Sequence, residues 1–371
     1  MNSRERVLTA MRRGQPDRVP INIRGVRVWD DEWLATRDRS YRPVIDAVLE
    51  HCDVIPHAGV PGIYLPLFTE AEKEITTTEL IDAGDWQIYR TFLHTPKGDL
   101  TQDYWESRTG YLPLTKKYFV KSPPDVDKVL SVPYVPPKLD LSSYFALRDR
   151  WPDHVVMCDC PQAASCVHEL MGSETFAYWW ADHRDLLFRL RDVFQERVLE
   201  AVREMLEAGV GPVLATHGSE QIAPPLHSPQ TYREFVLPIF RELCRLVHEA
   251  GCLLHVHCHN KLNALLEDVA EVGWDVLHPL EPPPVGDIDL ADAKRRVGDR
   301  LCLEGNIQIG ELYASPTERV ARLVTEAMEA GKPGGGFILC PSASPHTPTL
   351  SHLTVTNYLT MIETGVKLGA Y

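Results

Sequence analysis

From Asp153 onward, short apolar runs alternate with helical stretches, and this alternation constrains the fold more than any other feature of the chain. Apolar residues spaced by three and four between Tyr232 and Val247 mark the buried face of one such helix, which is expected to begin at Pro229 and to end at Gly251. Strands separated by helices form parallel sheets, so the chain is predicted to be an α/β protein. The runs with the composition of buried strands are 155–160, 211–218, 252–259, 276–281, 301–307 and 335–341.

The N-terminal run Val19–Ile23 supplies one more strand, after a helix capped by Asn2 and Glu5. No GxGxxG or P-loop sequence follows any of the strands, which counts against an open nucleotide-binding sheet. At 371 residues, a closed (β/α)8 TIM barrel is favoured over a doubly wound sheet. Between residues 72 and 120 the pattern changes to alternating residues with turn signals. An antiparallel β insertion is therefore predicted there, within a single barrel domain spanning residues 1–371.

Charge and composition exclude several classes of partner. The chain has 38 basic and 52 acidic residues, a net charge of −14, which opposes binding to nucleic acid or to an anionic membrane. No apolar stretch approaches the roughly 18 residues of a membrane span, and the charged N-terminus is unlike a secretory signal. The nine cysteines follow no disulfide framework, so they are expected to be reduced. These features predict a cytoplasmic protein.

Histidines at the end of the 252–259 strand are the strongest chemical signal. In a barrel, the loops at the carboxyl ends of the strands build the active site. Side chains alternate along a strand, so His255, His257 and His259 share one face. Two of them, His257 and His259, are predicted to bind a metal ion, with Cys340 and Glu220 as further ligands from the same rim. The alternative is that these are buried or solvent-capped histidines without a metal.

Other strand ends supply further candidates. At 216–220, His217 and Glu220 are candidate catalytic residues, and Glu220 is equally a candidate for fixing a histidine tautomer. Arg24 and Arg27, just past the first strand, are candidates for holding a substrate carboxylate, although a solvated pair beside Asp30 and Asp31 is as consistent with the pattern.

The strand end at 304–306 adds Glu304 and Asn306 as substrate-binding candidates. The cluster Cys158-Asp159-Cys160 is not expected to bind metal, because no second half of a thiolate motif follows it.

Several segments along the chain point to one family. The opening SRERVLTAMRRGQPDRVPINI is similar to the start of the uroporphyrinogen decarboxylase superfamily, which the chain resembles over most of its length. HTPKGDLTQDYWES and LPLTKKYFVKSPPDVDKVL are similar to an inserted segment of that superfamily's branch of zinc-dependent corrinoid methyltransferases. The strand GCLLHVHCHN and the segments VGDRLCLEGNIQIGELYASPTERV and GGGFILCPSASPHTP resemble the family's later strand-helix units. The resemblance implies a TIM barrel with its site at the strand carboxyl ends.

The methyltransferase branch holds zinc with a His-x-Cys-Gly sequence and a later Cys. His257 matches the His, His259 stands where the Cys would be, Asn260 stands where the Gly would be, and Cys340 lies close to the later Cys. With an imidazole in place of a thiolate, zinc would depend on Cys340, Glu220 or both to complete its shell. The decarboxylase branch needs no metal and grips carboxylates with an arginine-rich sequence, of which IRGVRVW preserves two arginines.

Two functions follow from this resemblance as expectations. The first is a metal-dependent methyltransferase that moves a methyl group between a corrinoid such as methylcobalamin, carried by a separate corrinoid protein, and a thiol or other small acceptor or donor. The alternative is a uroporphyrinogen decarboxylase-type decarboxylase of tetrapyrrole carboxylates, with Arg24 and Arg27 as the anion-binding residues. A noncatalytic tetrapyrrole carrier and a homodimer are left open.

Overall fold

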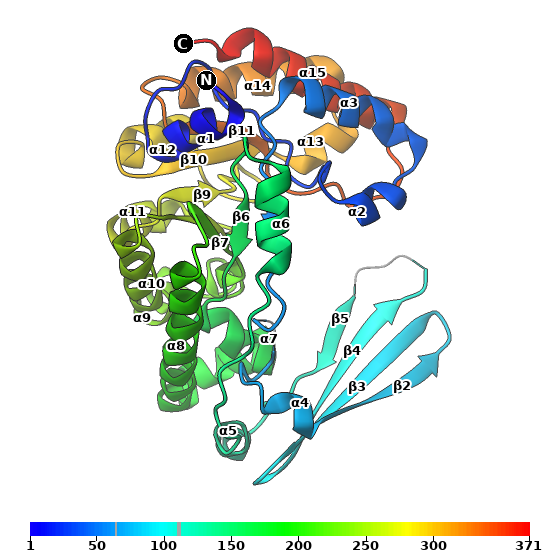
Figure 1. Cartoon of the computed structure of the whole chain (residues 1–371), viewed down its shortest axis with the longest axis vertical. Coiled ribbons are helices and arrows are strands. Elements are labelled where there is room, and N and C mark those ends of the chain that lie inside the picture. Colours follow the sequence, from blue (N-terminus) through cyan, green and yellow to red (C-terminus); the bar gives the residue numbers. More distant parts are fainter. Residues whose placement is uncertain (64, 110–112) are drawn as a thin grey trace. The chain divides into compact units, whose positions relative to one another are not determined.

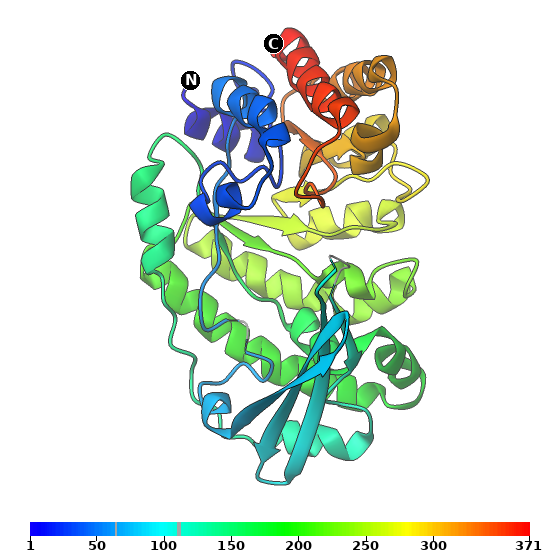
Figure 2. The same cartoon turned by 90° about the vertical axis from the view of Figure 1, so that its right-hand side faces the viewer.

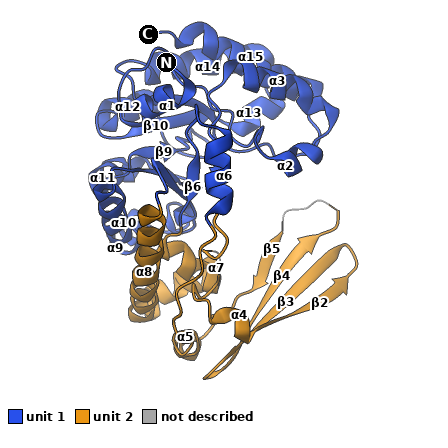
Figure 3. Ribbon diagram, viewed as in Figure 1, with its two compact units in different colours: residues 1–59, 141–160, 209–371 blue, residues 60–140, 161–208 orange. Residues whose placement is uncertain are grey.

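The computed structural model describes residues 1–63, 65–109 and 113–371, which form two compact units (Figure 3). Unit 1 comprises residues 1–59, 141–160 and 209–371, and unit 2 comprises residues 60–140 and 161–208. The part of the expected β insertion at 110–112 lies outside the described residues. The description of 1–371 as one domain stays a prediction.

Unit 1 contains all the parallel strands and the helices that follow most of them (Figure 1). Its elements are α1 (Ser3–Met11), α2 (Asp31–Ala35), η1 (Arg39–Tyr41), α3 (Arg42–His51), β1 (His57–Ala58), α6 (Ser142–Arg150), β6 (Met157–Asp159), β7 (Val213–Thr216), η2 (Ser219–Ile222), α9 (Pro229–Phe235), α10 (Leu237–Glu249), β8 (Leu253–His257), η3 (Asn263–Leu265), α11 (Leu266–Val272), β9 (Val276–His278), α12 (Leu290–Val297), β10 (Cys302–Ile307), α13 (Ile309–Ala314), α14 (Thr317–Gly331), β11 (Phe337–Pro341) and α15 (His352–Gly369).

The strands of unit 1 form one parallel sheet of seven strands in the order β1-β6-β7-β8-β9-β10-β11. Every later strand predicted from the sequence is present, so the α/β class is confirmed. Most strand residues are buried because helices such as α10 and α14 pack on the sheet (Figure 2).

The N-terminal run Val19–Ile23 does not form the continuous eighth strand that a closed barrel requires. It makes one parallel bridge, between Ile21 and Leu339 of β11, with Leu339 N donating to Pro20 O and Asn22 N donating to Leu339 O. On the other side, Asp53 N donates to Ile21 O. Pro20 has no N–H to extend the ladder. Among the described residues the sheet is therefore not closed by regular strands, and the eight-stranded barrel is confirmed only in its parallel α/β part.

The core of unit 1 lies inside this sheet and is sealed at one end by α1. Val7, Ala10 and Met11 of α1 pack with apolar residues from the amino-terminal halves of the strands, including Val213 and Ile338. The predicted capping box is present, since the Asn2 side chain accepts from Glu5 N and the Glu5 side chain accepts from Asn2 N. The helix ends at Met11.

The helix predicted from Pro229 to Gly251 is two helices, α9 and α10, because Pro238 lacks the N–H that a continuous helix would need. Its apolar stripe is buried as expected, with Tyr232, Phe240 and Val247 each inaccessible to solvent. In the part of the chain that the structure describes, no helix is both long and apolar enough to cross a membrane.

Unit 2 contains the antiparallel sheet predicted near the N-terminus. Its strands pair in the order β2-β3-β4-β5, all antiparallel, which confirms the β insertion. The insertion opens with a helical turn instead of a strand. The elements of unit 2 are α4 (Glu72–Ile75), β2 (Thr76–Ala83), β3 (Trp86–Thr95), β4 (Gly98–Ser107), β5 (Leu114–Lys117), α5 (Pro123–Leu130), α7 (Ala163–Asp182) and α8 (Arg184–Glu207).

Candidate functional site

Along each parallel strand of unit 1, the inward-facing side chains change from apolar to polar near the carboxyl end. On each strand a residue of the apolar core is followed two positions later by a side chain that carries chemistry, and residues two apart share a face of a strand. This register gathers polar side chains at the carboxyl ends of the strands. The pairs are Ile55 and His57, Met157 and Asp159, Ala215 and His217, Leu253 and His255, Val276 and His278, Cys302 and Glu304, and Ile338 and Cys340.

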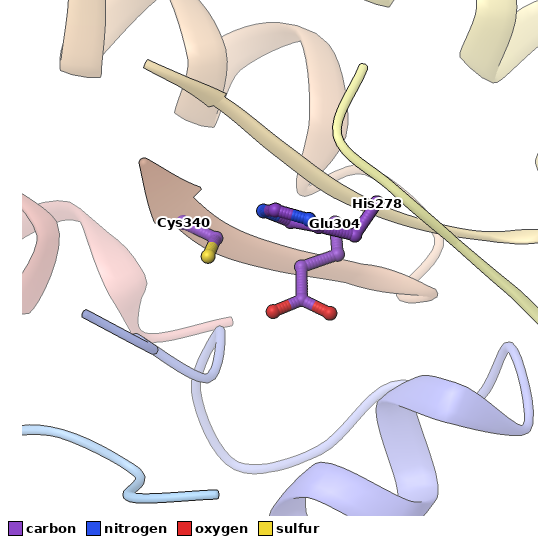
Figure 4. A group of neighbouring side chains, drawn as sticks. All are labelled: His278, Glu304 and Cys340. Atoms are coloured by element: carbon purple, nitrogen blue, oxygen red, sulfur yellow. The ribbon is translucent and has the colours of Figure 1, made fainter. Parts of the chain in front are cut away.

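Three neighbouring strands, β9, β10 and β11, bring His278, Glu304 and Cys340 together (Figure 4). Their ligand atoms all lie within 4.8 Å of one another, and all three residues are buried. A nitrogen, a carboxylate oxygen and a thiol sulfur are the donor types that zinc takes in proteins. This cluster, termed the inner triad below, is the group of side chains best suited to hold a metal ion.

Glu304 is a fully buried carboxylate with two hydrogen-bond donors. Asn22 Nδ2 donates to its Oε1 at 2.8 Å, and His255 Nε2 donates to its Oε2 at 2.7 Å. Burial acts to raise the pKa of Glu304, but the hydrogen bond from His255 and the neighbouring positive charges hold that pKa well below its usual range. Glu304 is therefore a carboxylate at neutral pH, and His255 Nδ1 is left buried without a partner.

His278 has a proton on one defined ring nitrogen. Its Nε2 lies 3.0 Å from the Pro341 carbonyl oxygen, which can only accept, so Nε2 carries the hydrogen. Burial and the Arg24 charge lower the pKa of His278 well below its ordinary value, so the ring is neutral and Nδ1 carries the lone pair. That atom lies 2.8 Å from His257 Nδ1, the registered partner of His278 across β8 and β9, and accepts a hydrogen bond from the His257 Nδ1–H. A histidine held by a backbone carbonyl at one nitrogen presents the lone pair of the other to a metal ion in the usual arrangement of a metal ligand.

Cys340 is a protonated thiol without a metal. Burial and then the Glu304 charge raise its pKa well above the ordinary value, and the Arg24 charge offsets this in part. A bound cation would reverse that shift, because a coordinating thiol is deprotonated. The donor set of the inner triad, with the unprotonated Nδ1 of His278, fits a zinc ion.

The other predicted ligands lie on either side of His257. The rings of His257 and His259 are 4.6 Å apart, and His259 Nδ1 lies 3.2 Å from Glu281 Oε2. The Glu220 carboxylate accepts a hydrogen bond from Gly218 N at 2.9 Å, while the Glu220 carbonyl accepts one from Asn260 Nδ2. The structure thus brings His257 and His259 together and places His257 against the inner triad through His278.

A cavity of about 420 Å³ opens over these strand ends. Its Arg24 Nη1 is buried without a hydrogen-bond partner, whereas Arg27 is exposed and lies 3.7 Å from Asp30. Gly25 adopts a φ of +82°, and a Cβ there would collide with Ser344. The cavity wall consists of Arg24, Gly25, Arg27, Trp29, Asp30, His57, Gly59, Asp159, His217, Glu220, His257 and Ser344.

Of the remaining candidates, Asn306 lines a different cavity of about 480 Å³, together with Gln308 and Glu311. Glu304 lies in the inner triad and bonds Asn22 and His255, as described above. His217 lines the cavity of about 420 Å³ and is exposed.

Sequence reasoning missed His278, His57 and Asp159. His278 lies within the run 276–281, and Asp159 within a cluster that was examined only for thiolate ligands. The signal that would have found them is positional, because each lies two residues after an apolar core residue near a strand end. His57 Nδ1 lies 3.4 Å from Asp159 Oδ1, across neighbouring strands β1 and β6.

A family model described as uroporphyrinogen decarboxylase (URO-D) matches residues 162–356. This range is more than half of the chain, so the chain belongs to the uroporphyrinogen decarboxylase family. It includes the strands that supply His257, His278, Glu304 and Cys340.

Curated relatives are similar over shorter stretches. A protein named uroporphyrinogen decarboxylase from Chlorobaculum parvum is 32% identical over 127 residues, which cover 34% of this chain and 32% of that protein. One of the same name from Aliivibrio salmonicida is 30% identical over 159 residues, which cover 41% of each. The chain thus matches well under two thirds of the length of these relatives.

Among solved structures, a methyltransferase from Methanosarcina mazei is similar in fold, with a TM-score of 0.62, 18% identity and 98% coverage of both chains.

Proposed function

We propose that this protein is a zinc-dependent methyltransferase that moves a methyl group between a corrinoid and a thiol or another small acceptor. The observation that supports it most is the inner triad, whose donor atoms lie within 4.8 Å of one another, with His257 Nδ1 hydrogen-bonded to His278 Nδ1. The fold of the Methanosarcina mazei methyltransferase is consistent with it. We infer that the sheet and the segment 19–23 together serve as the family's TIM barrel.

His278, Glu304 and Cys340 would hold the ion, and His257, His259 and Glu220 are the remaining ligand candidates at the cavity side. When bound, zinc would lower the pKa of an acceptor thiol and hold the sulfur as a nucleophile. Glu304 also orients His255, and the Pro341 carbonyl fixes the tautomer of His278. The cavity of about 420 Å³ accommodates a small acceptor and not a whole corrinoid, so the methyl donor is expected to arrive on a separate corrinoid protein.

Arg24 and Arg27 have different roles in this proposal. The buried, unpartnered Nη1 of Arg24 would bind an anionic group of the acceptor, because a buried guanidinium nitrogen without a partner is costly until a ligand satisfies it. Arg27, paired with Asp30 at the surface, contributes little. His217 and Glu220, on the same cavity wall, stay candidates for contact with the substrate.

A second candidate function is decarboxylation of a tetrapyrrole carboxylate. It is favoured by the names of the curated relatives and by the unpartnered Arg24 in the cavity. In that case Arg24 would grip a substrate carboxylate and the inner triad would have no metal to hold.

The test compares both reactions in the same preparations. Zinc-loaded protein is mixed with methylcobalamin and 2-mercaptoethanol, and demethylation of the corrinoid is followed by its visible spectrum. The methyltransferase proposal expects thiol-dependent demethylation that His257→Ala and His278→Ala abolish and Arg24→Ala reduces less. Consumption of uroporphyrinogen that Arg24→Ala abolishes and His257→Ala leaves intact would establish the decarboxylase instead.

A further inference from the structure

The cavity of about 420 Å³ contains a histidine–carboxylate pair that the metal cluster does not use. His57 begins β1, Asp159 ends β6, and both line the cavity wall. The two strands are parallel neighbours, with His57 in register with Met157, and Asp159 two residues further along β6 reaches His57 Nδ1 at 3.4 Å. Their side chains are 25% and 22% exposed, so each is half-buried and accessible from the cavity.

Asp159 sets which nitrogen of His57 carries the proton. Asp159 Oδ1 lies 3.4 Å from His57 Nδ1, and a carboxylate only accepts, so Nδ1 is the donor. The lone pair of a neutral His57 is then on Nε2, for which the described residues offer no hydrogen-bond partner. Burial and the Arg24 charge lower the pKa of His57, against the effect of Asp159, so the ring is neutral and able to accept a proton at neutral pH.

The other titratable groups of the cavity are engaged elsewhere. Asp30 caps α2 through Trp33 N and pairs with Arg27. The Glu220 carboxylate holds Gly218 N, and His257 faces His278. His217 is exposed to solvent at the cavity rim. Outside the proposed metal ligands, His57 is an imidazole of this wall with a carboxylate partner at hydrogen-bond distance, which fixes its tautomer.

We propose that His57 is the general base of this site and that Asp159 is its positioning residue, which rests on the methyltransferase function proposed above. When a thiol accepts the methyl group, the sulfur–carbon bond forms and the cobalt–carbon bond of the corrinoid breaks, with its electron pair staying on cobalt. The S–H proton passes to His57 Nε2, and the imidazolium is held by the Asp159 carboxylate until it loses the proton to solvent.

The first test measures how fast a proton is released on thiol binding and needs no methyl transfer. Zinc-loaded protein is mixed with 2-mercaptoethanol in a stopped-flow instrument at pH 7, and proton release is followed with a pH indicator. The wild type should release its proton about a hundredfold faster than His57→Ala, because His57 takes the proton from the thiol before passing it to solvent. His352→Ala, at an exposed position in α15, is the matched control and should behave as wild type. Equal rates from wild type and His57→Ala, or a slower rate produced by His217→Ala instead, would overturn the role of His57.

The second test uses metal-free protein and nitrogen-15 NMR of labelled histidines. His57 should be neutral at pH 7 with its proton on Nδ1, and Asp159→Ala should remove that preference. A proton on Nε2 of wild-type His57 would contradict the proposal. In the methylcobalamin assay, His57→Ala should lower the rate about a hundredfold. Exogenous imidazole should restore part of that rate, which a merely structural histidine would not allow.

The outcomes separate this proposal from the function on which it rests. If zinc-loaded wild type binds no thiol, the methyltransferase function and the role of His57 fail together. Normal binding with equal rates of proton release from wild type and His57→Ala overturns the role of His57 alone.

Discussion

Both ends of the parallel sheet in unit 1 contain buried polar and charged side chains. The two ends differ in how many of these side chains have hydrogen-bond partners within the protein. At the amino-terminal end, Asp53 is fully buried and accepts from Arg6 Nη1 at 2.8 Å, Arg18 Nη1 at 2.8 Å and Ile21 N at 3.2 Å. Asp275 likewise accepts from His248 Nε2, Leu254 N and Arg13 Nη1. Each buried carboxylate there has three donors from the protein itself.

At the carboxyl end, several buried polar atoms have no partner: Arg24 Nη1, His255 Nδ1 and Thr216 Oγ1. Buried polar groups without partners cost free energy, and they persist in native proteins mainly where function requires them. Buried charge alone therefore does not identify a functional site. A buried polar atom without a hydrogen-bond partner is the more informative sign. The amino-terminal end, termed the satisfied end because its buried carboxylates Asp53 and Asp275 have protein donors although Trp274 Nε1 beside them has no partner, holds the fold together. The carboxyl end is where a metal ion and a substrate are expected to bind.

The largest effect is expected at the satisfied end. Asp53→Ala removes the acceptor shared by Arg6 and Arg18 and leaves both guanidinium groups without that partner. Breaking a buried ion pair from one side costs about 3–5 kcal/mol of unfolding free energy. Urea unfolding followed by circular dichroism measures this loss. A loss below about 1 kcal/mol would show that the network is not what stabilises this end of the sheet.

The next prediction concerns Glu72 in unit 2, a buried carboxyl with one backbone donor in place of three. It tests whether a single donor is too few to keep the pKa of a buried carboxyl at its ordinary value. Its Oε2 accepts from Leu67 N, and burial raises the pKa of Glu72 from 4.5 to about 7. The unfolded chain ionises first, so this carboxyl lowers stability progressively as the pH rises from 4.5 to 7. The shift corresponds to roughly 3 kcal/mol above pH 7.

Glu72→Gln should therefore be more stable than wild type at pH 8 and equal to it near pH 4, measured by urea unfolding at both pH values. Glu74→Gln, at an exposed position in the same helix, is the control and should leave the pH profile unchanged. Identical profiles for wild type and Glu72→Gln would contradict the account of Glu72.

Two buried cysteines allow the proposed metal site to be compared directly with the apolar core of the sheet. Cys340 lies in the inner triad, and Cys302 lies in the apolar core two residues before Glu304. Both are fully buried, so substitution by Ala should cost each a similar, small amount of stability. Cys340→Ala should weaken zinc binding at least tenfold, as loss of a ligand does, and Cys302→Ala should not change it. Competition with a chelating dye gives both affinities, and equal affinities would remove Cys340 from the site.

The smallest change in unfolding free energy is expected at Arg24, and Arg18 serves for comparison. The two arginines flank the segment 19–23, which forms a bridge to β11. Arg18→Leu should be destabilising because it removes a partner of Asp53. Arg24→Leu should change the unfolding free energy by less than about 1 kcal/mol, or raise it, because its buried Nη1 has no partner to lose. Thermal unfolding of both variants checks this. A destabilisation by Arg24→Leu as large as that by Arg18→Leu would mean that Arg24 has a structural role.

The parallel sheet, the β insertion and the position of His257 and Cys340 near strand carboxyl ends could be predicted from the sequence, because alternation and strand-end position are local patterns. The closure of the barrel could not, because it depends on a ladder that Pro20 interrupts. His278 was missed for a different reason. A single histidine in an apolar run has no local mark, and its role arises only when β9 places it between His257 and the Pro341 carbonyl.

Glu304 shows the same limit of local sequence patterns, because the residue could be identified from the sequence but its contacts could not. Its position at a strand end marked it as a substrate-binding candidate, but its two oxygens are taken by Asn22 and His255, from segments that lie 282 and 49 residues away in the chain. Such partners follow from the strand order and not from spacing. Sequence patterns therefore identified the rim of the site, and tertiary contacts decided which side chains lie within ligand distance.

The most direct test of the account is to locate zinc in crystals of the zinc-loaded protein by anomalous scattering at the zinc edge. The account predicts one peak at the carboxyl end of the sheet, about 2.3 Å from Cys340 Sγ and about 2.1 Å from a ring nitrogen of His278. It further predicts that no zinc binds at the satisfied end around Asp53 and Asp275. A fully occupied peak elsewhere in the chain, or no peak in crystals grown with excess zinc, would contradict the central claim.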